Sequence, residues 1–382
     1  MSRCDRISLI QEIQNIRQSK VICYLTGDRV GAPGIQINSE MLRPLYEHIR
    51  DWGYNGVEKI DLYLYSRGGA VDVPWPLITM LREYCKELNV LIPFRAHSAA
   101  TLIALGADSI VMGKKGELGP IDPIFSRRMN DQDEVIPVED VMSYVGFLKE
   151  RVGLGDQTAL ANMAHILADK LTPWTLGSMY RTNSHIRNIA RKMLASHNEP
   201  LDEQKTNAII ETLAEKTYFH GHAIGRKEAE GIGLKIVRAP EQIDNLMWRL
   251  FECYEQLLKL NQPIDPRIIL SNNDREEIVD DIVLAVIETE ARTNLFGGKF
   301  KIQKFRQMPN QFNMPLNIGL PAGITPNILP EQLREMLQGF IQEIQAQLPG
   351  LVRSEIQKQA PIAKIQGDLL EAAWRDTTAA GD

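Results

Sequence analysis

The sequence predicts an α/β protein with a largely parallel β-sheet, because short apolar runs alternate with stretches of helical periodicity. This alternation is typical of parallel sheets joined by right-handed helical crossovers. The predicted strands cover 20–26, 58–65, 89–95 and 108–113, and the predicted helices cover 5–18, 39–52, 74–87 and the residues after Ser98. Parallel sheets place ligand sites where their strands end.

The individual elements follow from local patterns. The first helix carries isoleucine at every third position, which places one apolar stripe on a single face. The apolar run KVICYLT at 20–26 reads as a strand. The helix at 39–52 begins near Ser39, and serine is a preferred helix-capping residue.

The rest of the chain predicts a helical insertion and a helical appendage. The insertion at 137–217 is expected to contain helices at 137–151, 156–168, 173–197 and 202–217, followed by helix 226–232, strand 234–237 and helix 240–260. Pro, Asn and Gly cluster in 262–330, which predicts irregular structure, with a linker or arm at 305–328 and helices at 329–347 and 350–376. We therefore expect a domain at 1–260, an irregular arm at 261–328 and a C-terminal helical segment at 329–382.

The composition excludes several classes of protein. With 44% hydrophobic and 24% charged residues, the chain of 382 residues is ordinary for a globular protein. A net charge of −6 argues against a general nucleic-acid binder, which needs a basic surface. The four cysteines are widely spaced and predict reduced thiols rather than a metal site, and no carboxylate cluster accompanies the histidines. We expect neither a metal nor another cofactor.

The hydropathy pattern predicts no membrane anchor. The N-terminal residues lack the apolar core of a signal peptide. No stretch approaches the roughly 20 apolar residues needed to span a bilayer. We therefore expect a cytoplasmic protein.

Two strand ends carry the chemistry-bearing residues. The apolar run at 89–95 leads to Ser98, and a run of small, helix-forming residues follows at once. Serine at a sharp strand-to-helix turn exposes its hydroxyl near the positive end of the helix. The apolar run at 58–65 leads to Gly68 and Gly69, which can aim backbone N–H groups at an anion. A serine and a donor loop are two parts of an acyl-transfer site.

These motifs resemble the ClpP class of serine peptidases, which includes signal peptide peptidase A, and are most similar to the serine dehydrogenase proteinases. The matching segments are Tyr65–Gly69, Ala96–Ala99, Leu118–Pro123 and His220–Leu234. The resemblance runs from about residue 20 to about residue 250. It implies a ClpP/crotonase-like fold, and it departs at Arg67, where the family has proline.

The resemblance implies roles for three residues of the acyl-transfer site. Ser98 would be the nucleophile, and the N–H groups of Gly69 and Ala99 would form the oxyanion hole, with Gly68 allowing the turn. The alternatives are a serine that only caps a helix and an ordinary glycine turn after a strand.

The base that activates Ser98 is left open by the sequence. The segment after the nucleophile's helix and strand, where the Clp subunit carries its histidine, contains none here. Lys149 lies beside the apolar face of a predicted helix and corresponds to the lysine of signal peptide peptidases; Lys170 is a further possibility. His220 falls on the family's histidine. The alternatives are a solvated lysine and a structural histidine.

The sequence thus predicts a soluble serine endopeptidase acting on a peptide or protein. The resemblance also implies a homo-oligomer, and the C-terminal helices are expected to suit a protein partner. Two alternatives remain: a crotonase-type acyl-CoA enzyme, and a non-catalytic ClpP-like scaffold or regulator. The substrate specificity and the pathway cannot be derived from the sequence.

Overall fold

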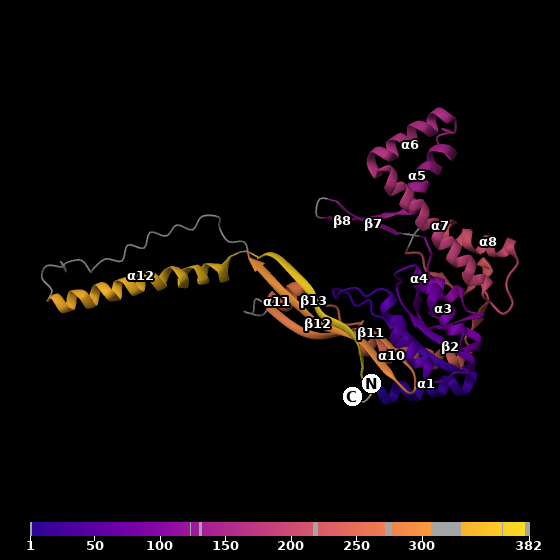
Figure 1. Ribbon diagram of the computed structural model, residues 1–382, viewed down its shortest axis with the longest axis horizontal. Coiled ribbons are helices and arrows are strands. Elements are labelled where there is room, and N and C mark those ends of the chain that lie inside the picture. Colours follow the sequence, from indigo (N-terminus) through magenta and orange to yellow (C-terminus); the bar gives the residue numbers. More distant parts are fainter. Residues whose placement is uncertain are drawn as a thin grey trace. The chain divides into compact units, whose positions relative to one another are not determined.

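A computed structural model describes residues 2–122, 124–129, 132–216, 221–271, 277–306, 330–360 and 362–378. The chain divides into two compact units (Figure 1). The first comprises Met1–Ile264, Asp281–Gly298 and Glu371–Asp382, and the second comprises Asp265–Asp280 and Lys299–Leu370.

An eight-stranded sheet confirms the predicted α/β fold. Its strand order is β10-β5-β3-β2-β1-β11-β12-β13. The strands are β1 (Lys20–Thr26), β2 (Val57–Tyr65), β3 (Cys85–Ile92), β5 (Ser109–Met112), β10 (Ile236–Arg238), β11 (Glu277–Glu288), β12 (Thr293–Arg306) and β13 (Ile362–Asp376). The first five in that order are parallel to their neighbours, and β11 is antiparallel to β1. A smaller sheet joins β4 (Arg95–Ala96), β6 (Glu117–Leu118) and β9 (Ile224–Gly225).

Helices cover both faces of the parallel strands, so the strands are apolar on both sides. Successive residues of β1 enter different cores: Tyr24 belongs to one, and Cys23 and Leu25 to the other. The first core is filled by α2 (Leu42–Arg50), α3 (Pro74–Arg82), α4 (Ala99–Leu105), α7 (Pro173–Ala195) and α8 (Glu203–Glu211), and the second by α1 (Arg3–Arg17) and α10 (Glu241–Leu257).

The predicted helical insertion is present. It contains α5 (Val138–Glu150), α6 (Gln157–Leu171), α7 and α8, and it ends in a short π-helical turn, η2 (Thr212–Lys216). A hairpin of β7 (Ile124–Met129) and β8 (Gln132–Pro137) precedes α5 and was not predicted. The remaining helices are η1 (Ser39–Met41), α9 (Arg226–Ile232), α11 (Pro266–Ser271) and α12 (Glu331–Gln359).

Two predictions for the C-terminal third were wrong. The arm expected to be irregular at 261–328 contains the long strands β11 and β12, because β11 pairs with β1 and extends the sheet. The segment at 329–382 is helical only as far as Gln359, and β13 then joins the sheet beside β12. Outside that third, one helix is shorter than predicted: the helix expected at 74–87 ends at Arg82, since Cys85 already pairs with Val57. Most of the linker expected at 305–328 lies outside the described residues.

Within the described ranges, no helix is long and apolar enough to cross a membrane.

Candidate active site

Ser98 occupies a strained turn between β4 and α4. Its backbone has φ 52° and ψ −117°, a conformation that non-glycine residues seldom adopt, at a cost of about 1–3 kcal/mol. Its side chain makes no capping hydrogen bond to α4. The residue as a whole is half-buried. The capping role considered as the alternative is thus absent from this structure.

The glycine loop after β2 packs directly against this turn. A β-carbon on Gly68 would lie 2.7 Å from Cβ of Ser98 and 2.8 Å from the carbonyl oxygen of His97. Gly68 has φ 109° and Gly69 has φ 154°, so both are in the region that favours glycine. A β-carbon on Gly69 would lie 2.4 Å from the backbone nitrogen of Ile37. Only glycine therefore allows the loop to lie between Ile37 and Ser98.

Hydrogen bonds hold the loop in one conformation. The N–H of Ile37 donates to the carbonyl of Gly68 at 2.9 Å, and the N–H of Ala70 donates to the carbonyl of Ile37 at 2.8 Å. The N–H of Gly68 donates to Oγ of Ser66 at 3.0 Å. Because Gly69 lies between these bonds in a parallel bridge with Ile37, its own N–H points away from that segment.

Two backbone N–H groups remain available beside Ser98. Those of Gly69 and Ala99 have no hydrogen-bond partner in the described part of the chain. Ala99 is the first residue of α4, so its N–H is one of the unsatisfied donors of a helix N-terminus. The structure thus places Gly68 against Ser98 and Ala99, with Gly69 next in the same loop; the oxyanion role of Gly69 and Ala99 stays a prediction.

Thr101 fixes the first turn of α4. Its buried Oγ1 lies 2.7 Å from the carbonyl of Ala96 and 2.9 Å from the carbonyl of Gly119, and it accepts from the N–H of Gly119 at 3.1 Å. A β-carbon on Gly119 would lie 3.0 Å from Cγ of His97. The segment after β6 therefore packs under the Ser98 turn, which limits its movement.

A network of ion pairs surrounds the turn and was missed in the sequence. Asp28 accepts from Tyr65 Oη at 2.6 Å, from Arg67 Nε at 2.6 Å and from Arg95 Nη1 at 3.2 Å. The Nε of Arg95 donates to Glu117 at 3.1 Å. These residues are distant in sequence, but Asp28, Arg67 and Arg95 each follow a buried strand, and that shared position was the available signal.

The pKa of Asp28 is lowered despite its partial burial. Burial alone would raise that pKa, but hydrogen bonds from Tyr65 and Arg67 and the charges of Arg67 and Arg95 outweigh it. The carboxylate therefore stays ionised and keeps its partners. Glu117 also approaches His97, with 3.4 Å between Oε1 and Nε2.

Of the predicted bases Lys149 and His220, only Lys149 lies in the described part of the chain, and it is not beside Ser98 there. Lys149 is exposed in the last turn of α5, which Figure 1 shows apart from α4. His220 lies outside the described residues. His222, two residues later, is exposed and pairs with Glu228 at 2.8 Å. Asp122 is buried. The pKa of Glu139 is raised mainly by the burial of Glu139 and further by the charge of Asp122.

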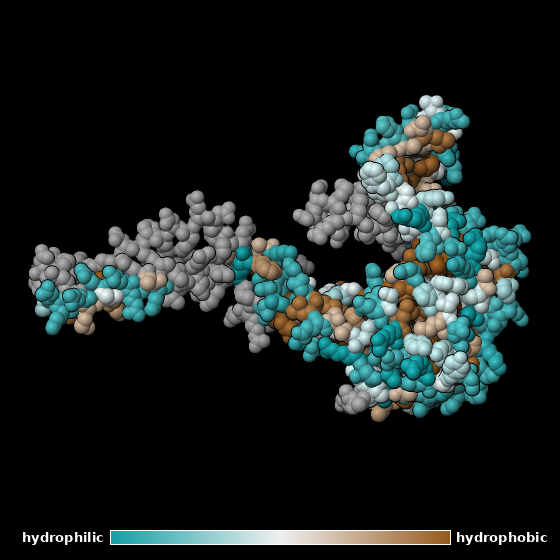
Figure 2. Space-filling model, viewed as in Figure 1, coloured by the Kyte–Doolittle hydropathy of each residue, from teal (hydrophilic) through white to brown (hydrophobic). Residues whose placement is uncertain are grey.

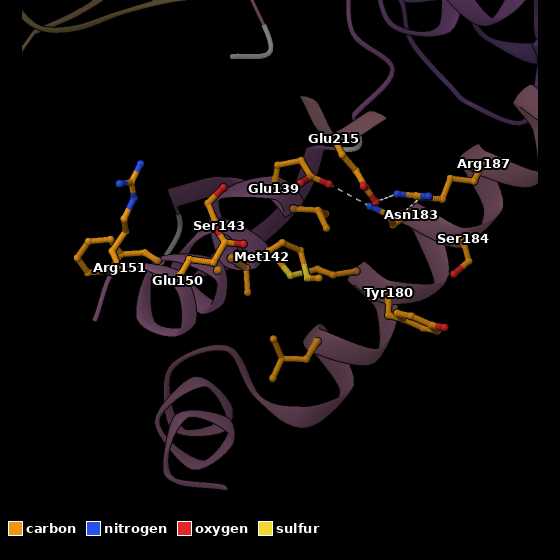
Figure 3. Close-up of a pocket in the computed structure, with 16 residues that line it drawn as sticks. Glu139, Met142, Ser143, Glu150, Arg151, Tyr180, Asn183, Ser184, Arg187 and Glu215 are labelled. Carbon is orange, nitrogen blue, oxygen red and sulfur yellow. Dashed lines mark hydrogen bonds and ion pairs between the residues drawn. The ribbon is translucent and has the colours of Figure 1, made fainter. Parts of the chain in front are cut away.

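A cavity of about 760 Å³ lies between α5 and α7 (Figure 3). Its lining includes the apolar side chains of Met142, Phe147 and Met179, and Ser98 is not part of it. Asn183 donates to Glu139 at 3.2 Å, and Arg187 forms an ion pair with Glu215. The cavity is therefore polar at the end near η2 and apolar along the helices.

The surface of the insertion is also apolar in places. Figure 2 shows brown areas over the insertion helices. Among the exposed large side chains of α5, α6 and α7 are Phe147, Ile166, Trp174 and Tyr180. Exposed apolar areas of this kind mark contact surfaces in many proteins.

The described residues contain no group of three or more His, Cys, Asp or Glu side chains able to hold a metal ion.

Residues 2–135 match the family described as ClpP-like SDH-type serine proteinases. The resemblance predicted from the sequence is thereby confirmed for the part of the chain that contains Ser98 and the glycine loop.

The individual proteins that match this chain have low sequence identity to it. An uncharacterized protein of Methanocaldococcus jannaschii is 26% identical over 264 residues, which cover 66% of this chain and 79% of that protein. A second uncharacterized protein of the same organism is 31% identical over 127 residues, covering 31% of this chain and 41% of that protein. A mutant of the 1510-N membrane-bound stomatin-specific protease matches with TM-score 0.31 and 16% identity, covering 59% of this chain and 83% of that structure. That structural likeness is too weak to support an inference.

Proposed function

Proceeding from the match of residues 2–135 to the ClpP-like SDH-type serine proteinases, we propose that this chain is a serine endopeptidase with Ser98 as its nucleophile. The observation that carries the proposal is the strained, uncapped Ser98 beside two unengaged N–H groups. Strain at a functional side chain persists only where the surrounding structure enforces it, as Gly68 and Thr101 do here.

In the proposed reaction, Oγ of Ser98 attacks the carbonyl carbon of a peptide bond and gives its proton to a base. The carbonyl oxygen becomes an oxyanion held by the N–H groups of Gly69 and Ala99. The base returns the proton to the leaving amine as the C–N bond breaks. Water, deprotonated by the same base, then hydrolyses the acyl ester and restores Ser98.

Lys149 and His220 are both retained as proposed bases. A hydroxyl needs a neighbouring base to become nucleophilic, and apo structures often show catalytic groups farther apart than they are with substrate bound. Lys149 acts in this scheme only if α5 approaches α4. His220 acts only if the segment after η2 places it beside Ser98.

A second candidate is a non-catalytic scaffold of the same fold. It is favoured by the position of Lys149, which is exposed in the last turn of α5 rather than beside the Ser98 turn. The crotonase-type alternative has no comparable observation in its favour.

The rate of labelling by a fluorophosphonate separates these candidates. We expect wild type to react, and the variant that lacks the base, Lys149→Ala or His220→Ala, to react about 10²–10⁴ times more slowly. Lys192→Ala and His222→Ala are matched controls, since Lys192 is also exposed in the last turn of an insertion helix and His222 is two residues from His220. Wild-type rates in both base variants would contradict both assignments, and an unreactive wild type would favour the scaffold.

A further inference from the structure

Three cations lie at the end of the sheet where Ser98 is found. Arg67 follows β2 and Arg95 follows β3, while Lys115 lies shortly before β6. They face two carboxylates, Asp28 and Glu117.

Arg67 differs from the other two cations because its terminal guanidinium nitrogens are left without a described partner. The guanidinium of Arg95 donates hydrogen bonds to both carboxylates and lies over the Phe94 ring, with 4.1 Å between Cζ and the ring centroid. Lys115 approaches Glu117 at 3.6 Å. Arg67 is bound to Asp28 through Nε alone, and its two terminal nitrogens make no hydrogen bond to any described residue.

The side chain of Arg67 is both held and accessible. Its 2.6 Å bond to Asp28 restrains the guanidinium, while 54% of the side chain is exposed. Restraint lowers the entropy lost when a ligand binds. The terminal nitrogens of a guanidinium are suited to bind a carboxylate with two parallel hydrogen bonds.

Arg67 also lies close in the chain to the glycine that packs against Ser98. It immediately precedes Gly68, which packs against Ser98. An extended peptide advances about 3.3–3.6 Å per residue. Residues one to three positions from a carbonyl held at Ser98 are therefore within the span of an arginine side chain that starts on this loop.

We propose that Arg67 is a specificity-determining residue that binds an acidic side chain of the substrate close to the bond that is cleaved. This inference rests on the proposed peptidase function. Asp28 acts as the positioning residue, because it holds Nε and leaves the terminal nitrogens to the substrate carboxylate.

The test measures protection of Ser98 from fluorophosphonate by two pools of random heptapeptides, one with Glu and the other with Gln at the central position. For wild type, we expect the Glu pool to halve the labelling rate at about one-tenth the concentration of the Gln pool. In Arg67→Ala the two concentrations should become equal. In Arg67→Glu a pool with central Lys should protect better than the Glu pool.

Lys86→Ala is the matched control. Lys86 also forms an exposed ion pair of 2.6 Å, with Glu58, but it lies at the start of β3, on the opposite edge of the sheet. It should keep the tenfold preference for the Glu pool. Arg67→Lys, which preserves the charge, should retain part of that preference, and thermal unfolding of each variant checks that it is folded.

The outcomes separate the inference from the proposed function. If Ser98 is labelled and the two pools protect wild type equally, or neither protects it, the inference is wrong and the nucleophile stands. If Lys86→Ala loses the preference as fully as Arg67→Ala, the effect is one of net charge and the inference is again wrong. If wild type is not labelled at all, the proposed function fails and the inference fails with it.

Discussion

At the scale of single residues, the site depends on one close approach. The strained backbone of Ser98 and the loop at Gly68 are in contact. A side chain at position 68 would overlap Ser98, so the contact requires glycine there. The N–H of Gly68 already donates a hydrogen bond to Oγ of Ser66. Gly68 therefore contributes shape, whereas Gly69 contributes the proposed donor.

Gly68→Ala tests this division of roles. The new methyl group would overlap Cβ of Ser98 at a positive φ, so the loop must shift away from the nucleophile. We expect labelling of Ser98 to slow by about 10²-fold, as for the loss of one oxyanion donor, with a stability loss of about 1–3 kcal/mol. The labelling rate measures the first effect, and urea unfolding measures the second.

Gly177→Ala provides the control, because Gly177 lies inside α7 with open space around its Cα. There the substitution should leave labelling unchanged and raise helix stability slightly. Equal labelling by Gly68→Ala and wild type would show that the close approach is unimportant.

At the scale of elements, the sequence predicted the parallel strands and most helices well. Their apolar runs and periodicities are local, and both faces of the sheet are covered by helices. It failed for β12, although even-numbered residues such as Phe296, Phe300 and Ile302 are buried at strand period. Gly297 and Gly298 interrupt that alternation, because glycine stands at position 298, where an apolar side chain would continue it. Strands whose partners are remote in sequence have no local signal of pairing.

The junction of α2 with the turn between β11 and β12 shows such a remote contact. His48 is buried there, 3.0 Å from Oγ1 of Thr289 and 2.9 Å from Oδ1 of Asn294. Burial, aided by the charge of Arg292, lowers the pKa of His48 from 6.5 to about 4, against the opposing effects of the hydrogen bond to Oδ1 of Asn294 and of the charges of nearby carboxylates. The folded protein therefore holds this imidazole neutral.

This contact predicts a pH dependence of stability. Because the folded pKa lies below the unfolded one, the unfolded chain takes up a proton first as the pH falls. The contribution of His48 is fully present above pH 6.5 and is lost between pH 6.5 and about 4. Between pH 7 and pH 5 we expect the free energy of unfolding to fall by about 2 kcal/mol from this group.

Urea unfolding at both pH values measures this loss. His48→Gln should remove about 2 kcal/mol of the decrease, while His222→Gln, at an exposed histidine, should not. A decrease of the same size in wild type and His48→Gln would show that other groups cause it.

At the scale of the whole molecule, the candidate site belongs to the part that was predicted best. Ser98, Gly68, Gly69 and Ala99 all lie at strand or helix ends of the first unit, where short local patterns determine the backbone. The base stays a prediction, because Lys149 is exposed in the insertion and His220 lies outside the described residues. The second unit has no assigned role in the proposed chemistry.

The central claim is that Ser98 is an activated nucleophile. Peptide mapping of wild type and Ser98→Ala after reaction with a fluorophosphonate tests it most directly. We predict one adduct per chain on the peptide that contains Ser98, and none on the variant. A folded wild type without an adduct, or an adduct that persists in Ser98→Ala, would contradict the claim.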